Sequence, residues 1–570
     1  MANGPFLSRG ARDHALTFLA EGAVLVATIL VYKLAAERLG TDGFERYTVV
    51  RRTVSFLQMM GMCGLAVGLV RSVAMVAAPG RRVGLLRRAT RRIGIVSLAL
   101  LLMALFLPGP LALVFFGSAG PSALVVPIAV LSIGLMAHVL VYGYLRGSHR
   151  MAGANALQVV GMAVVPNLAM FLFHDLERVL WATGGTWLLL SGAVLAWAWR
   201  EARVEHDVAD ERRMLRYGLL RLPGDVIFAG LLTLPVYLVN QVQGLGVGAQ
   251  LAFGITLINV AGAAYSPLSL LLLPSAAGLL ARRAWGLLNG RIARVMRLSA
   301  LSALVLVIGF EVLASPFLDL YLGPRGAAME RMCRLVFIGA FFYGVFVALR
   351  SVLDAYYTAP RNTFNLGWSV VLFVPLAAVY VFVLPVWWMA AMLVVVPLAA
   401  LFALTWRDVH WVRADLRVME RKVPGLLHVL EPTALPGRDA AITAEQVEWT
   451  MLHVPRPGGP LSWLRILRGV RSAEHRLRPD LVVVRGQGGL ALLALFVSRR
   501  PVVLVLERDT MRGWGRLAAW AAALVVCPSP DEADELRWRE GRVRVLDPMP
   551  DGGRQLLHFL RVLHHPMPSA

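Results

Sequence analysis

Residues 93–116, with the sequence IGIVSLALLLMALFLPGPLALVFF, decide the fold class of this chain. A helix of this length crosses the ~30 Å hydrocarbon layer of a bilayer. Of the 570 residues, 58% are hydrophobic, and the mean hydropathy is +0.64, which excludes an ordinary soluble protein. Because lipid cannot hydrogen-bond the backbone, we expect such runs to form helices.

Residues 1–410 divide into about twelve apolar runs of this kind. We predict an α-helical polytopic membrane protein with two six-helix lobes, over residues 1–205 and 206–410. The twelve expected helices are centred near Val26, Gly64, Ala104, Leu131, Ala163, Leu190, Leu232, Asn259, Val305, Ala340, Phe373 and Val395. Residues 1–14 are short, polar and basic, and no small-residue cleavage site follows, so we expect no cleavable signal peptide.

Arginine is distributed unevenly among the expected loops. The loops at residues 108–122 and 244–250 have no charged residue, whereas those after the second, sixth and eighth helices are rich in arginine. These arginines are Arg81, Arg82, Arg87, Arg88, Arg91, Arg92, Arg200, Arg203, Arg212, Arg213, Arg216, Arg221, Arg282, Arg283, Arg291, Arg294 and Arg297. Arginine-rich loops stay in the cytoplasm, so we predict a cytoplasmic (inner) membrane protein with both termini cytoplasmic.

The net charge of +22 is explained by this retention signal and by contact with anionic membrane lipid. We therefore expect no nucleic-acid partner. The three cysteines, Cys63, Cys333 and Cys527, are not at motif spacing, so we expect no disulfide, metal site or cofactor.

The second half of the membrane region repeats the first. Pro110, Gly117 and Gly120 recur 206 residues later as Pro316, Gly323 and Gly326, and Gly43 recurs 205 residues later as Gly248. Such an offset covers an even number of helices, so the two halves are parallel repeats. Transporters built from repeats hold their substrate between the halves, which rock around it.

Five segments carry a resemblance to a known family. They are LAAERLGTDGFERY (34–47), GLAVGLVRSVA (64–74), LRYGLLRLPGD (215–225), PLSLLLLPSAAGL (267–279) and FLDLYLG (317–323). Residues 1–410 resemble the Wzx-type polysaccharide flippases, whose superfamily also contains multidrug (MATE) exporters and the lipid II flippase. The resemblance implies two six-helix bundles around a central cavity. It also implies translocation of an undecaprenyl-diphosphate-linked oligosaccharide across the membrane for cell-envelope polysaccharide biosynthesis.

Polar side chains inside the expected helices are the candidates for substrate binding. A diphosphate requires cations, and arginine offers forked donors, so we predict that Arg71, Lys33 and Arg350 face the cavity. Arg71 could instead extend to the cytoplasmic face. Asn240 and Gln241 could donate to sugar hydroxyls, or they could form a hydrated helix end.

Three carboxylates are the candidates for ion or proton coupling: Glu21, Glu311 and Asp225. Asp225 directly follows Pro223 and Gly224, where it could instead be a helix N-cap.

After residues 411–424, an expected linker, the composition changes. Residues 425–570 read as a small cytosolic α/β domain, Rossmann-like, with parallel strands separated by helices. The expected strands are at 426–430, 480–486, 502–509, 524–530 and 543–546.

The order of these strands, with RPDLV at 478–482 and CPS at 527–529, resembles the N-terminal half of a family-4 GT-B glycosyltransferase. The half that would bind a nucleotide sugar is missing, so we expect a non-catalytic domain. The turn with Gly486, Gly488 and Gly489 could cradle a phosphate or could be a structural tight turn.

The sequence favours a flippase for lipid-linked oligosaccharide rather than an enzyme. Its tail would dock polysaccharide-synthesis glycosyltransferases or a polymerase. The alternatives are a membrane-anchored glycosyltransferase, a multidrug exporter coupled through Glu21 and Glu311, and a transport-inactive scaffold.

Overall fold

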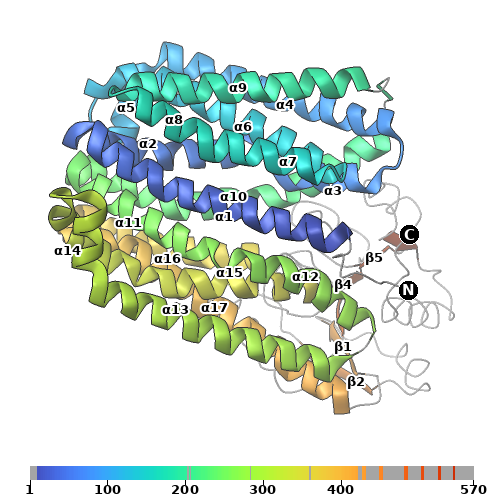
Figure 1. Ribbon diagram of the computed structural model, residues 1–570. Coiled ribbons are helices and arrows are strands. Elements are labelled where there is room, and N and C mark those ends of the chain that lie inside the picture. The colour runs from blue at the N-terminus through green and yellow to red at the C-terminus, as the bar shows by residue number, and fades with distance from the viewer. Residues whose placement is uncertain are drawn as a thin grey trace, which may run out of the picture. The chain divides into compact units, whose positions relative to one another are not determined.

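The structure, a computed structural model, describes residues 9–201, 204–205, 207–282, 284–357 and 361–421, together with six strands of the tail (Figure 1). The chain divides into two compact units. Unit 1 comprises Met1–Pro267, Arg297–Ala348 and Asn365–Thr405, and unit 2 comprises Leu268–Met296, Leu349–Phe364 and Trp406–Ala570.

Long apolar helices form nearly all of the described chain (Figure 1). The first half contains α1 (Arg9–Arg38), α2 (Gly40–Gly61), α3 (Leu65–Met75), α4 (Pro79–Phe106), α5 (Pro108–Phe116), a 3-10 turn (Gly120–Leu124), α6 (Val125–Gly147), α7 (Met151–Gln158), a π-helical turn (Val159–Val164), α8 (Val165–Leu172) and α9 (Leu176–Glu201). The second half contains α10 (Val208–Val242), α11 (Leu245–Ala263), α12 (Ser266–Ala281), α13 (Trp285–Leu322), α14 (Arg325–Phe337), α15 (Gly339–Tyr356), α16 (Arg361–Phe382) and α17 (Trp387–Arg421).

These helices confirm a polytopic helical membrane protein. In the described chain, 11 helices are long and apolar enough to cross a membrane, or 12 if α2 and α3 form one span bent by 48°. The bend lies where we expected the centre of the second span. Cys63 and Gly64 adopt left-handed backbone conformations there, with φ of 48° and 73°.

The repeat expected from the sequence is visible in the element boundaries. Helix α13 begins 206 residues after the start of α4 and ends 206 residues after the end of α5. Gly117 and Gly323 follow these ends with φ of 76° and 64°. Gly40, the first residue of α2, and Gly244, directly before α11, have φ of 69° and 88°. Left-handed glycines terminate a helix without a Cβ penalty, so paired glycines terminate paired helices.

Within unit 1, α10 packs against α2 and α3 at backbone distance. A Cβ added to Gly64 would lie 2.0 Å from the carbonyl oxygen of Gly218, and one added to Gly68 would lie 3.1 Å from that of Met214. Small residues allow helix backbones to approach in this way, as is common in membrane helices. The contact joins the first helix of the second repeat to the bend in the first.

The described strands of the tail form one parallel six-stranded sheet in the order β2-β1-β3-β4-β5-β6. They are β1 (Leu426–Glu431), β2 (Glu448–His453), β3 (Leu481–Arg485), β4 (Val502–Val505), β5 (Leu524–Cys527) and β6 (Val543–Val545). Five were expected; β2 was not, because EWTMLH lacks a continuous apolar run. The segments between the strands, including Gly486, Gly488 and Gly489, lie outside the described residues. Helix α17 continues through residues 411–421, most of the segment that we expected to be a linker.

We predict that Gly64→Ala lowers the apparent Tm of the detergent-purified protein. The left-handed backbone alone costs an L-residue about 1 kcal/mol, and the Cβ would also force α10 away from the bend. The control is Gly94→Ala on α4, where an added Cβ meets nothing within 4 Å. We expect the control to leave Tm unchanged or to raise it, and equal Tm values for the two variants would contradict the proposed contact.

The orientation of the helices is testable by cysteine labelling. Arg87 lies near the start of α4, a helix of 28 residues or about 42 Å, and Ser118 follows α5 at the other end. With the three native cysteines replaced, Ser118→Cys should react with an impermeant maleimide on whole cells. Arg87→Cys should react only after permeabilisation, and labelling of both from outside would reject the predicted orientation.

Candidate functional site

Helix α2 places two adjacent arginines, Arg51 and Arg52, near its midpoint. The helix packs against α1, α6, α10 and α11 in unit 1, so its midpoint is surrounded by protein. The side chain of Arg52 is only 7% exposed, and Arg51 is half-buried. Charged groups in such a position are costly and mark functional sites in membrane proteins.

Arg52 is held by polar groups of α11. Its Nη2 donates to the hydroxyl of Thr256 at 3.1 Å. The side-chain oxygen of Asn259, with the amide turned to face the guanidinium, accepts from Nη1 at 2.6 Å and from Nη2 at 2.8 Å. The Thr256 hydroxyl also lies 3.1 Å from that of Tyr32 on α1. Among the described residues no acceptor faces the Nε of Arg52, so this buried donor remains unsatisfied.

An aromatic shell surrounds the pair. Arg51 hydrogen-bonds to Tyr32 and lies close to Tyr47. The rings of Tyr32 and Tyr47 meet edge to face with centroids 5.4 Å apart, and Phe253 of α11 is 5.8 Å from Tyr32. The tyrosine faces and hydroxyls partly stabilise the cations, although they carry no full negative charge.

No described carboxylate forms a salt bridge with Arg51 or Arg52. Unit 2 shows the contrast, because Arg361 is also 7% exposed and lies 3.3 Å from the fully buried carboxylate of Asp408. Removing an ion from water costs several kcal/mol, and a nearby opposite charge normally offsets that cost. The Arg51–Arg52 pair is therefore a buried cationic site whose counter-charge does not come from the described chain.

The pair lies where the two repeats meet. Arg52 and Thr256 are 204 residues apart, within one residue of the 205 that separates the starts of their helices, α2 and α11. Arg52 thus contacts the helix of the second repeat that is equivalent to its own. A ligand at this site would touch both halves at once.

The cationic residues predicted from the sequence lie elsewhere. Lys33 is half-buried on α1, next to Tyr32, and Arg71 is exposed four residues before the end of α3. Arg350 is half-buried on α15 in unit 2, and its carbonyl accepts from Asn362 at 2.9 Å. Substrate contact by these residues stays a prediction.

Asn240 and Gln241 occupy the end of α10 and hydrogen-bond to α5. The amide of Asn240 donates to the carbonyl of Phe115 at 2.6 Å, and that of Gln241 donates to the carbonyl of Leu113. These bonds satisfy carbonyls in the last turn of α5. Sugar recognition by the two amides remains a prediction.

The candidate coupling carboxylates have different surroundings. Glu21 is exposed on α1 and accepts from the hydroxyl of Tyr142 at 3.1 Å. Glu311 on α13 lies 3.5 Å from Arg334 of α14, which also pairs with Glu330 at 2.8 Å.

Asp225 lies half-buried inside α10, so our alternative assignment of this residue as a helix N-cap is wrong. The helix begins at Val208, where the side chain of Asp207 caps its first turn, and it continues through Pro223. The N–H of Ala209 donates to the Asp207 carboxylate at 2.8 Å and, with Arg81, holds the pKa of Asp207 below its ordinary value. Coupling through Asp225 stays a prediction.

The sequence reading missed Arg51 and Arg52 because they lower the local hydropathy. We centred the second span at Gly64, beyond the pair. A usable signal exists: no Asp or Glu stands three or four residues from either arginine on α2. A helical arginine pair without such partners, between two apolar segments, indicates a buried site.

Comparison with known proteins supports the fold. No family model and no curated protein sequence matches the chain. The solved structure of the lipid II flippase MurJ, in an inward closed conformation, aligns with a TM-score of 0.54 at 10% identity, over 71% of this chain and 90% of that one. The eukaryotic MATE transporter AtDTX14 aligns with a TM-score of 0.54 at 12% identity, over 72% of this chain and 98% of that one. The membrane region of this chain therefore has the fold that MATE transporters share with the lipid II flippase.

Proposed function

We propose that the protein translocates a lipid-linked oligosaccharide, carried on a diphosphate, across the cytoplasmic membrane for cell-surface polysaccharide synthesis. The buried arginine pair is the observation that carries this proposal. A diphosphate supplies the missing negative charge, and guanidinium groups bind phosphate oxygens through paired hydrogen bonds. The similarity to a lipid II flippase agrees with such a substrate.

The pair argues against export of cationic drugs. A cationic substrate requires an accessible carboxylate, and the charges buried between α2 and α11 have the opposite sign. Of the carboxylates that would couple such an exporter, Glu311 is paired with Arg334. Glu21, the other candidate carboxylate, is exposed on α1 and accepts a hydrogen bond from Tyr142, and neither carboxylate forms a described salt bridge with the arginine pair.

The position of the pair suggests how transport proceeds. Arg52 on α2 and Thr256 on α11 belong to different repeats, so a rocking motion changes the space around the guanidinium. In this proposal the lipid tail stays in the bilayer, and the diphosphate stays bound to Arg51 and Arg52 as the two halves move. Arg51 and Arg52 would hold the diphosphate, and the polar groups of Arg71, Lys33, Asn240 and Gln241 would line the path of the sugars.

The tail is proposed to be a non-catalytic docking domain on the cytoplasmic side. Its parallel sheet agrees with the Rossmann-like fold expected from the sequence. A domain tethered beside the entry point would hold glycosyltransferases or a polymerase close to the lipid-linked product, which raises their effective concentration. Both termini are then cytoplasmic.

A built-in counter-charge tests the site. In Asn259→Asp a carboxylate replaces the amide that lies 2.6–2.8 Å from the Arg52 guanidinium. We expect this variant to lose at least about tenfold in the rate of flipping, because its carboxylate competes with the diphosphate. We also expect its apparent Tm to rise, because the buried cation gains a partner. The measurement is translocation of a fluorescent polyprenyl-diphosphate saccharide in proteoliposomes, with Tm measured in detergent.

The matched control is Asn259→Gln, which keeps an uncharged amide. It should lose less activity than the Asp variant and should not gain stability. Arg52→Leu should also abolish flipping without loss of Tm, because it removes an uncompensated charge. Wild-type flipping by Asn259→Asp would show that the pair serves only the fold.

Deletion of residues 425–570 tests the tail. We expect the truncated protein to insert normally and to flip the reporter lipid in proteoliposomes at the wild-type rate. In cells, surface polysaccharide should fall several-fold, because the biosynthetic partners are no longer held at the membrane domain. Loss of flipping in proteoliposomes would instead make the tail part of the translocation machinery.

A further inference from the structure

A cavity of about 1040 Å³ lies at the arginine-rich end of unit 1. Its walls come from the third to fifth turns of α4, the last turn of α9, the connection that follows α9 and the first turn of α10. It is lined by different residues from those around Arg52. The function proposed above makes no use of it.

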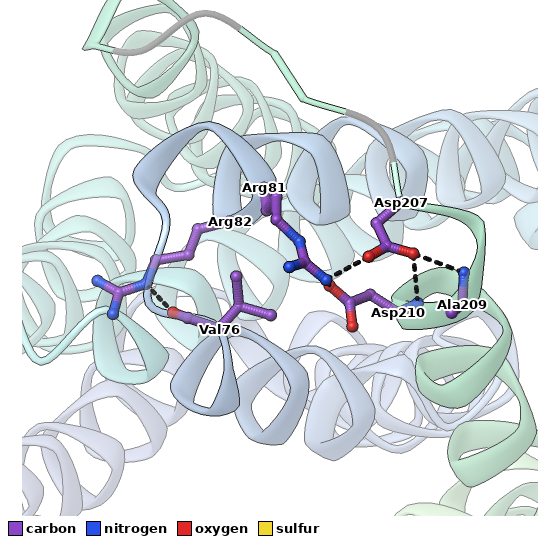
Figure 2. Close-up of polar contacts among 6 residues, drawn as sticks. All are labelled: Val76, Arg81, Arg82, Asp207, Ala209 and Asp210. Atoms are coloured by element: carbon purple, nitrogen blue, oxygen red, sulfur yellow. Dashed lines mark hydrogen bonds and ion pairs between the residues drawn. The ribbon is translucent and has the colours of Figure 1, made fainter.

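Polar contacts fix the wall between α4 and α10. The guanidinium of Arg81 lies between the carboxylates of Asp207 and Asp210 and pairs with both (Figure 2). The backbone N–H of Glu205 donates to the carbonyl of Gly80 at 3.1 Å. The connection between the repeats is therefore anchored to the start of α4.

Arg82 points away from the ion pairs of Arg81 with Asp207 and Asp210, toward the loop before α4 (Figure 2). Its Nε donates to the carbonyl of Val76 at 2.6 Å. Arg81 and Arg82 thus have structural partners, and neither is among the residues that line the cavity.

The cavity itself has an excess of positive charge. Four arginines line it, Arg87, Arg88, Arg91 and Arg92, against the single carboxylate of Glu211, which leaves three positive charges. Arg88 and Arg92 both pair with Glu211, Arg92 at 3.2 Å. Arg87 and Arg91 are exposed, and neither forms a salt bridge with a described residue. Two forked donors therefore face solvent beside a cationic cavity.

An exposed apolar strip continues from these arginines along the same face of α4. Arg87 and Arg91 are followed, at helical spacing, by Ile95, Leu98 and Leu102, whose exposed fractions are 62%, 56% and 42%. From residue 87 to residue 102 the strip is about 22 Å long, the scale of an acyl chain that enters the bilayer. Trp199, also in the cavity wall, is 43% exposed, and tryptophan favours the headgroup level of a membrane.

We propose that this cavity binds the phosphate headgroup of an anionic phospholipid, whose acyl chains lie along the apolar strip of α4. Arg87 and Arg91 bind the phosphate, while Arg88, Arg92 and Glu211 form the charged floor. Basic pockets between transmembrane helices bind anionic headgroups in this way. The apolar strip favours a lipid over free phosphate, because free phosphate has no apolar chain that could contact the strip. The orientation predicted above makes it a lipid of the cytoplasmic leaflet.

The test uses the full-length protein, purified in detergent and titrated with defined lipids while bound lipid is counted by native mass spectrometry. We expect phosphatidylglycerol and cardiolipin to bind and phosphatidylethanolamine not to bind. Arg87→Gln/Arg91→Gln should weaken phosphatidylglycerol binding at least about tenfold. Arg87→Lys/Arg91→Lys should restore part of it, because lysine keeps the charge and loses the fork. Both arginines are exposed and form no salt bridge within the described part of the chain, so the fold should tolerate the change.

The matched control is Arg291→Gln/Arg294→Gln on α13, which removes the same charge from two exposed arginines outside the cavity. It should bind lipid as the wild type does. Equal weakening in the two double variants would reduce the effect to general surface charge and reject the site. Displacement of the lipid by millimolar inorganic phosphate would reject a lipid occupant in favour of a free anion. Neither result depends on whether the protein flips oligosaccharides.

Discussion

The approach of the α10 backbone to the bend between α2 and α3 is the contact on which the rest of unit 1 depends. Because Gly64 and Gly218 have no side chains, the two backbones meet directly. This contact sets the position of α10, and α11 follows α10 after one left-handed glycine, Gly244. Helix α11 therefore reaches α2 at the level of Arg52, where Thr256 and Asn259 contact the guanidinium.

Charge is handled in two ways in this protein. Where a charge stabilises the fold it has an opposite charge, as Arg361 has Asp408 and Arg81 has Asp207 and Asp210. At Arg51 and Arg52 the described residues offer only hydroxyls, an amide and aromatic rings. An amide and a hydroxyl orient a guanidinium without neutralising it, so the positive charge of the pair would act on the diphosphate that we propose as substrate.

Much of the fold followed from the sequence because the bilayer leaves few options. Each expected span centre falls in an apolar helix or, at Gly64, in the break between two helices. The repeat was also visible, since Gly117 and Gly323 terminate equivalent helices. The arginine pair was not found, because hydropathy averages over a window and cannot tell an arginine in a loop from one buried by neighbouring helices. Those neighbours, Thr256 and Asn259, are more than 200 residues away along the chain.

The helix start that we inferred from Pro223 was wrong for a related reason. Pro223 suggested the start of a helix with Asp225 as its cap, yet α10 begins at Val208 and contains both Pro223 and Pro235. In a membrane helix, neighbouring helices and polar side chains can satisfy the backbone groups that a proline leaves free. The extent of α10 and the partners of Arg52 both depend on tertiary contacts that local sequence does not encode.

The clamp of Arg81 on Asp207 and Asp210 has a mechanical consequence. The segment that joins the two repeats is bound to α4, so in the proposed rocking motion it would not be a free hinge. Bending would instead occur farther along α10, where Pro223 and Pro235 each remove a backbone hydrogen bond. Helix α10, the first helix of the second half, would then be fixed to α4 at its start and would bend at Pro223.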